Sequence, residues 1–195
     1  MNGWLNIYKE PGYSSAHLLN KIKKHFRIKK IGHLGTLDPL ACGVLPVAVG
    51  EATKTINYIE NNKKCYEFII KWGEETDTYD KEGVVLRESS KRPLKKNIQN
   101  VINNYFLGEI FQVPPKFSAV KVEGKRAYDL ARKNLEFKLK KKKIKIYLFK
   151  FLKSIDKNHT KFYIECSKGS YVRTIIQDLS IKLGTFGHAK EIKRT

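Results

Sequence analysis

Apolar and polar residues alternate along several short stretches of the chain, which is typical of half-buried β-strands. The clearest stretch runs from Tyr66 to Trp72, where Phe68 and Ile70 share the apolar face with these two end residues. A long basic stretch at residues 137–152 predicts one or two further strands. Shorter strands are predicted at Gly3–Tyr8, Val44–Val49, residues 118–122, and around Phe162, Ile164 and Cys166.

Other segments have apolar residues three and four positions apart, which predicts amphipathic helices. One begins after Ser14 or Ser15, either of which is a suitable N-cap. Its predicted apolar side consists of Leu18, Leu19, Ile22 and Phe26. Further helices are predicted at Glu51–Ile59, Lys95–Phe106, residues 126–133, and after Ser170, where Val172, Ile175, Ile176, Leu179 and Leu183 form the core stripe.

The predicted strands and helices are interspersed without the regular alternation of parallel βαβ units. We therefore expect an α+β fold, with a mixed, largely antiparallel sheet flanked by helices. The chain has 195 residues, of which 41% are hydrophobic, and no repeat or low-complexity linker divides it. This length and composition predict a single domain over residues 1–195.

The charge of the chain is strongly unbalanced. Lysine and arginine number 39 against 19 acidic residues, which gives a net charge of +20. Such an excess repels itself in the folded state and favours an anionic partner such as RNA, DNA or a membrane surface. The alternative is a drift in composition toward lysine, isoleucine and asparagine without functional meaning.

The cysteine pattern predicts free thiols and no metal site. The three cysteines, Cys42, Cys65 and Cys166, form no CxxC pair, and their odd number without a secretory signal suits a reducing compartment. The N-terminus has no apolar signal region, and no stretch is long enough to span a bilayer. We therefore expect a cytoplasmic protein that has no membrane partner.

Two residues are candidates for acid and base chemistry. Asp38 lies in a glycine-rich segment, GHLGTLDPLACG, where Asp-Pro is also a common turn sequence. Arg173 falls in the first turn of the last predicted helix, where a cation is unfavourable unless an anion lies nearby. Its partner is either Asp178 or solvent, or else a catalytic carboxylate whose ionised form the arginine would favour.

Aromatic and basic side chains near this segment suit RNA. Tyr66 is either a core tyrosine or a ring on which a displaced base stacks, and His33 either caps a loop or contacts such a base. The segment KIKKHFRIKK, which ends with Lys29 and Lys30, directly precedes the glycine-rich loop and is well placed for phosphate contacts. The lysine cluster at residues 138–145 is either a solvated strand face or a second phosphate-binding strand.

One long segment, KKIGHLGTLDPLACGVLPVAVGEATK, resembles the signature of the TruB family of tRNA pseudouridine synthases. The resemblance continues in five shorter motifs and covers nearly the whole chain. These motifs are KEPGYSS, KKCYEF, PPKFSAVKVEGKRAYDLAR, CSKGSYVRTIIQDL and GHAKEIKRT.

The resemblance implies a pseudouridine synthase fold and a defined set of site residues. Asp38 matches the catalytic aspartate, Tyr66 the tyrosine that stacks on the target uracil, and Arg173 the arginine that pairs with the aspartate. His33 matches a histidine that helps to hold the flipped nucleotide. Lys9 matches a lysine near the site, and Ile192 an apolar residue that lines the uracil pocket.

The reaction that the resemblance implies is isomerisation of the uridine at position 55 in the T loop of tRNA. It breaks an N–C glycosidic bond and forms a C–C bond to the same base, so no redox change, energy source, cofactor or metal is expected. Asp38 attacks the ribose or the uracil ring, or promotes glycal formation, and the sequence leaves these routes open. The partner expected is the T arm of tRNA, without a protein partner and with the enzyme as a monomer.

The chain departs from the family pattern in three places. Cys42 stands where a small hydroxyl residue is usual, and Glu10 separates Lys9 from its proline. The sequence stops at Thr195, so the usual C-terminal RNA-binding domain is expected to be absent. Alternative functions are a tRNA-binding or folding factor without turnover, a guide-RNA-dependent relative that acts on ribosomal RNA, and a generic basic RNA-binding protein.

Overall fold

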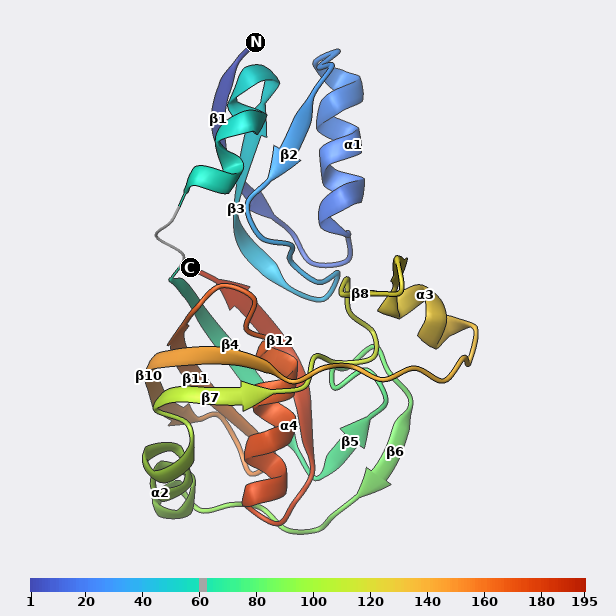
Figure 1. Cartoon of the computed structure of the whole chain (residues 1–195). Coiled ribbons are helices and arrows are strands. Elements are labelled where there is room, and N and C mark those ends of the chain that lie inside the picture. The colour runs from blue at the N-terminus through green and yellow to red at the C-terminus, as the bar shows by residue number, and fades with distance from the viewer. Residues whose placement is uncertain (60–62) are drawn as a thin grey trace.

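The computed structural model describes residues 1–59 and 63–195, and its elements follow the chain in mixed order (Figure 1). The strands are β1 (Gly3–Lys9), β2 (Ile31–His33), β3 (Cys42–Val49), β4 (Lys64–Trp72), β5 (Glu74–Thr76), β6 (Val85–Glu88), β7 (Gly108–Gln112), β8 (Lys121–Val122), β9 (Lys125–Arg126), β10 (Lys142–Ser154), β11 (His159–Cys166) and β12 (Gly187–Arg194). The helices are α1 (Ser15–His25), the 3-10 helix η1 (Gly50–Tyr58), α2 (Lys95–Tyr105), α3 (Ala127–Arg132) and α4 (Val172–Lys182).

One eight-stranded sheet organises the molecule, in the order β1-β3-β12-β4-β11-β10-β7, with β2 paired to β3. Every neighbouring pair in this sheet is antiparallel except β12 with β3, which run parallel through only two residue pairs. The expected α+β fold with a mixed, largely antiparallel sheet is therefore confirmed. Hairpins β5–β6 and β8–β9 lie outside the sheet.

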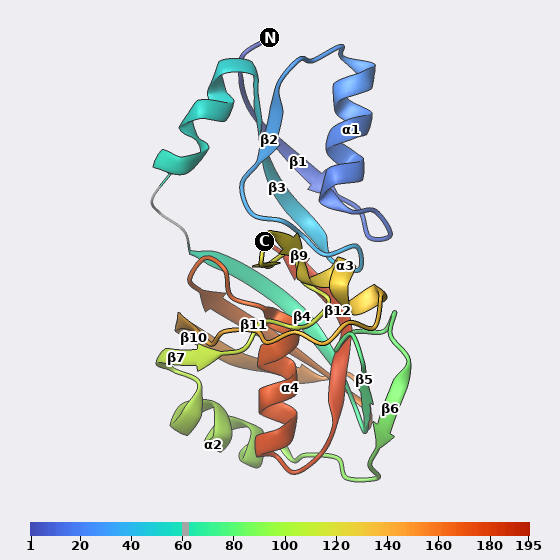
Figure 2. The same cartoon turned by 45° about the vertical axis from the view of Figure 1, so that its right-hand side comes forward.

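The β3–β12 junction joins an upper group of elements, containing β1, β2, β3, α1 and η1, to the rest of the molecule (Figures 1 and 2). Gly43 of β3 faces Arg194 of β12 in this junction, and its φ is +111°. A β-carbon at Gly43 would collide with the Arg194 carbonyl, so only glycine permits this approach. The two groups of strands therefore form one sheet because residue 43 has no side chain.

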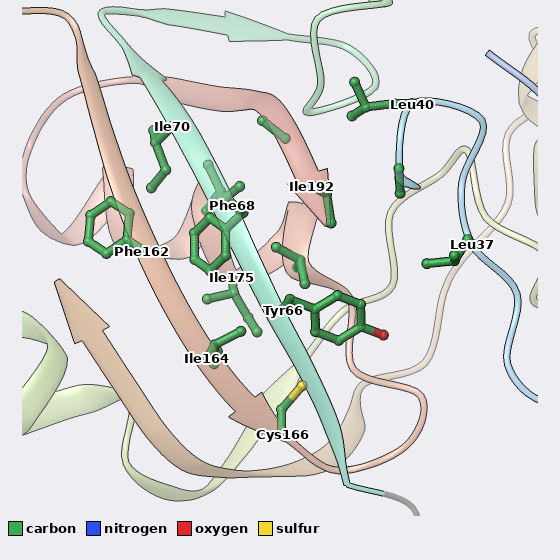
Figure 3. Packing of buried hydrophobic residues seen from close by; sticks show 14 of the residues in the cluster. Leu37, Leu40, Tyr66, Phe68, Ile70, Phe162, Ile164, Cys166, Ile175 and Ile192 are labelled. Carbon is green, nitrogen blue, oxygen red and sulfur yellow. The ribbon is translucent and has the colours of Figure 1, made fainter. Parts of the chain in front are cut away.

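The main core lies between the sheet and the helices α2 and α4 (Figure 1). The predicted apolar face of β4 is buried, and Phe68 stacks on Phe162 of β11 with ring centroids 5.4 Å apart (Figure 3). Helix α4 supplies the opposing stripe, in which Ile175, Ile176 and Leu179 are fully buried. Burying a side chain of this size stabilises the fold by about 1.5–3 kcal/mol. The stripe thus holds α4 at a fixed position on the sheet.

The structure corrects several sequence predictions. Phe26 is exposed, because α1 ends at His25 and Phe26 is its C-cap. The helix predicted at Glu51–Ile59 is a 3-10 helix, and the strand predicted from Phe137 begins only at Lys142. Strands β2, β5, β6, β7, β9 and β12 were not predicted.

Candidate active site

A cavity of about 380 Å³ opens beside the β3–β12 junction. Its wall comes from five parts of the chain that are distant in sequence: the loop of residues 34–41, the start of β4, the segment before β8, the turn before α4 and the end of β12. Pockets of roughly 300–1,000 Å³ with a few convergent polar groups are typical of ligand sites. The charged and phenolic side chains in the wall are those of Asp38, Lys64, Tyr66, Lys168, Tyr171 and Arg194.

The 34–41 loop is fixed in place by its own sequence. Gly35 adopts a φ of +80°, which a glycine accommodates without strain. Ser15 at the start of α1 bonds both backbone polar groups of Leu37. Its Oγ accepts from the Leu37 amide and donates to the Leu37 carbonyl, each at 2.9 Å. Beyond them, the Ala41 amide donates to the Asp38 carbonyl at 3.0 Å. These bonds hold the backbone on both sides of the Asp38 carboxylate.

Asp38 and Arg173 meet at this loop although 135 residues separate them. Arg173 Nε donates to Asp38 Oδ2 at 2.8 Å. The arginine side chain is 4% exposed and the aspartate side chain 36% exposed. The carboxylate therefore has one oxygen bound by a buried cation and a face open to the cavity, which suits a positioned nucleophile or base.

Arg173 is held by three more acceptors on its other side. Its Nη1 donates to the Thr78 carbonyl at 2.9 Å and lies 3.4 Å from Asp80 Oδ2, and its Nη2 donates to the Phe117 carbonyl at 3.0 Å. Asp178, the alternative partner considered from the sequence, is not among these acceptors. The network fixes the guanidinium before any ligand arrives, because its nitrogens are already bonded to the protein.

Asp80 is a site residue that the sequence prediction missed. Its side chain is buried, and it accepts from Thr78 Oγ1 at 2.7 Å and from the Glu82 amide at 3.0 Å. The only signal in the sequence was an acidic run between residues 74 and 82 in a chain of net charge +20. That run alone predicts a polar loop.

Tyr66 and Ile192 form the apolar side of the cavity. Both are buried, at 8% and 4% exposed, and Figure 3 shows the Tyr66 ring below Ile192 with its hydroxyl on the side of Leu37. Burial raises the pKa of the Tyr66 hydroxyl to about 12, although the positive charge of Arg194 acts in the opposite direction. Tyr66 is therefore a neutral phenol at physiological pH, with a flat ring available for stacking.

Lys9 occupies a different place from the one expected of a substrate-binding residue. Its side chain is 1% exposed, and its ammonium donates to the carbonyls of Glu10, Tyr13 and Pro39 at 2.9, 2.7 and 3.3 Å. Burial lowers the pKa of Lys9, and the negative charges nearby only partly offset this. Lys9 thus ties the turn after β1 to the 34–41 loop, and its three donors are used within the protein.

The remaining predicted residues lie outside the cavity wall. His33 ends β2, and its Nε2 is 3.1 Å from Thr36 Oγ1. Burial, with a contribution from the Arg194 charge, lowers the pKa of His33. Lys29 and Lys30 are exposed between α1 and β2, at the end of β2 opposite His33. They suit contact with a partner that extends beyond the cavity.

The described residues contain no group of three or more His, Cys, Asp or Glu side chains arranged to hold a metal ion. No helix in that part of the chain is long and apolar enough to cross a membrane. The chemistry of the cavity is that of a carboxylate, two guanidinium groups, two ammonium groups and two phenols.

Comparison with known proteins decides the family. Residues 23–172 match the family model described as TruB family pseudouridylate synthase (N terminal domain). The chain belongs to the TruB family. Relatives named tRNA pseudouridine synthase B include one from Caulobacter sp. (strain K31), which is 43% identical over 195 residues, and one from Wolbachia pipientis subsp. Culex pipiens (strain wPip), 49% identical over 197 residues. This chain is covered completely in both alignments, but it spans 63% and 55% of those relatives.

Two solved structures show that the TruB fold extends over this chain. A chain in an H/ACA RNP bound to a substrate RNA containing 2′-deoxyuridine aligns with a TM-score of 0.71 at 26% identity. A chain in a Cbf5-Nop10-Gar1 complex aligns with a TM-score of 0.73 at 27% identity. Each alignment covers 99% of this chain, and 46% and 48% of the respective neighbour. The pseudouridine synthase fold expected from the sequence is confirmed.

Proposed function

We propose that this chain is the catalytic domain of a tRNA pseudouridine synthase, and that it isomerises the uridine at position 55 of the T loop. The observation that carries the proposal is the Asp38 carboxylate, bound at 2.8 Å by a buried arginine and facing a cavity beside a neutral tyrosine ring. The names of the relatives support tRNA as the substrate. Asp38 is the nucleophile in this proposal, and Tyr66 and Ile192 enclose the uracil.

The target base has to leave the helical stack before it reaches Asp38. Unstacking a base costs a few kcal/mol, and stacking on an aromatic side chain offsets about 1–3 kcal/mol of this cost. Tyr66 offers that ring at the cavity wall. His33, next to the cavity loop, is proposed to contact the displaced nucleotide.

The basic surface supports binding of the T arm. A depression on α1 and the turn after it is lined by His17, Asn20, Lys21, Lys23, Lys24, Arg27 and Ile28, and Lys29 and Lys30 follow directly. The Ser15–Leu37 hydrogen bonds attach the start of α1 to the 34–41 loop. The basic surface along α1 therefore extends outward from the site. Phosphate contacts of this kind make affinity fall steeply with salt. The expectations of a cytoplasmic location and a monomeric state remain predictions.

The decisive experiment incubates the chain with an unmodified tRNA transcript and detects pseudouridine with a chemical probe. Wild type is expected to convert the T-loop uridine, and Asp38→Asn to abolish turnover while it retains RNA binding. Glu88→Gln is the matched control, because it removes one carboxylate from the exposed strand β6, outside the cavity. Turnover that survives in Asp38→Asn would remove the nucleophile from the proposal.

A guide-RNA-dependent activity is the second candidate, because the structural neighbours are chains of an H/ACA RNP and of a Cbf5-Nop10-Gar1 complex. The higher identity to relatives named tRNA pseudouridine synthase B favours direct action on tRNA. Modification of a naked T-arm RNA without added protein or guide supports the first candidate. Dependence of turnover on a guide RNA would support the second.

A further inference from the structure

Arg194, at the end of β12, is a buried guanidinium with hydrogen-bonding capacity to spare. Its side chain is 4% exposed, and its Nε donates to the Val44 carbonyl at 2.7 Å. Its Nη2 is buried and has no hydrogen-bond partner among residues 1–59 and 63–195. A buried donor left without an acceptor destabilises the folded state, more so when it is charged. Such a donor in a cavity wall indicates that a ligand supplies the missing acceptor.

The position of Arg194 matches the proposed reaction. It lines the same cavity as Asp38 and Tyr66. Gly35 of the 34–41 loop lies so close that a β-carbon there would be 3.2 Å from Arg194 Nη1. The bond to the Val44 carbonyl therefore holds the guanidinium beside the Gly35 backbone. A group fixed in this way costs little reorganisation when charge develops beside it.

The charges of the cavity favour an anion at Arg194. Arg173 is already neutralised by Asp38 and Asp80, whereas no ion pair to a carboxylate is found for Arg194 among the described residues. Lys64 lines the same wall, and its pKa is lowered by burial and then by the charge of Arg194. A negatively charged ligand would lower the repulsion between these two cations and stabilise the charged form of both.

We propose that Arg194 is a catalytic residue that stabilises negative charge on the uracil after it separates from the ribose; this inference rests on the function proposed above. When the C1′–N1 bond breaks, its electron pair stays on the base, the charge spreads over N1 and the carbonyl oxygens, and the Asp38 carboxylate forms a bond to C1′. The base then turns, and its C5 forms a bond to C1′ as the bond to Asp38 breaks and the free carboxylate returns. The C5 proton passes to a base or to water, and N1 gains a proton. Arg194 donates to a uracil carbonyl oxygen until the new bond forms.

The first test compares Arg194→Met and Arg194→Lys with Lys193→Met under single turnover, with saturating enzyme and a T-arm RNA. Lys193 is the adjacent residue on the exposed face of β12, so its replacement removes the same charge outside the cavity. Loss of one preorganised donor of this kind lowers a rate constant by about 100- to 1,000-fold. We expect this loss in Arg194→Met, a smaller loss in Arg194→Lys, and no change of rate in Lys193→Met.

The second test replaces the target uridine with 5-fluorouridine and measures cleavage of its glycosidic bond by nucleoside digestion. Fluorine makes uracil a better leaving group, so the loss caused by Arg194→Met is expected to shrink by at least about tenfold. Equal losses with both substrates would overturn the proposal and leave Arg194 with a structural role. Thermal unfolding identifies a misfolded Arg194→Met protein, in which case Arg194→Lys carries the comparison.

A backbone phosphate is the other possible source of an anion at Arg194. If the guanidinium binds a phosphate, the variants will lose RNA affinity in a filter-binding assay while their single-turnover rate at saturation stays unchanged, and the proposal is then wrong. Failure of the wild-type chain to form any pseudouridine would instead count against the proposed function. The two proposals can therefore fail separately.

Discussion

Replacing Arg173 with methionine is expected to damage the fold as well as the site. Arg173 is 4% exposed and neutralises Asp80, whose side chain is 6% exposed. Without the guanidinium, the Asp80 carboxylate stays buried with only Thr78 Oγ1 and the Glu82 amide as donors. Removing one partner of a buried ion pair costs about 3–5 kcal/mol. Asp38→Asn should cost less than about 1 kcal/mol, because the Asp38 side chain is 36% exposed.

The assay is thermal unfolding followed by circular dichroism, with urea unfolding as an independent measure. In a chain of 195 residues, 1 kcal/mol corresponds to about 2–4 °C in Tm. Arg173→Met should therefore lower Tm by about 6–20 °C, and Asp38→Asn by at most about 4 °C, although both variants should lose pseudouridine formation. Equal Tm values for the two variants would refute the idea that Arg173 is part of the structural core.

Three further predictions concern the β3–β12 junction, the 34–41 loop and pH. Gly43→Ala should destabilise the chain by at least about 2 kcal/mol in urea, because the added β-carbon meets the carbonyl of the last strand at a φ of +111°; wild-type stability would refute this close approach. Lys9→Met should lower the free energy of unfolding in urea by about 2–4 kcal/mol and slow turnover, because three carbonyls lose their donor. Unchanged stability would instead support a role of Lys9 in substrate binding. Burial raises the pKa of Asp178 to about 6, so its contribution to stability is present below about pH 4 and is lost as pH rises through 6. Asp178→Asn should then stabilise the chain at pH 8 by about 1–2 kcal/mol. The shift in the pKa of Asp178 sets an upper limit of about 3 kcal/mol, and partial exposure of the side chain reduces it. An equal gain in stability at pH 4 would contradict burial of the charge as the cause.

The sequence predicted the elements whose burial follows a regular period. Strand β4 and helix α4 each bury one face, so their apolar residues recur at two and at three or four positions. Strand β12 escaped prediction because a register shift between Ala189 and Glu191 breaks its alternation. Strand β6 is exposed on both faces and therefore carries no apolar period.

Within the candidate site, the sequence identified individual residues better than it identified the residues that contact them. The position of Arg173 in the first helical turn left its partner open, the family resemblance paired it with Asp38, and the structure places Asp38 there. The second anion, Asp80, depends on how the β5–β6 hairpin folds against α4, which no local pattern records. The burial of Lys9 was not predicted for a similar reason, because one of its acceptors, the carbonyl of Pro39, lies in a loop 30 residues away in sequence.

Strand β12 is the last element of the chain, yet it lies between β3 and β4 in the middle of the sheet. During synthesis, β3 and β4 emerge before β12, which must insert between them, so the sheet can close only after β12 has emerged. Contacts between residues 43 and 194 have a very long sequence separation, and such contacts slow folding. Until β12 emerges, the nascent chain therefore presents two unpaired strand edges, which makes this stage the one most exposed to aggregation.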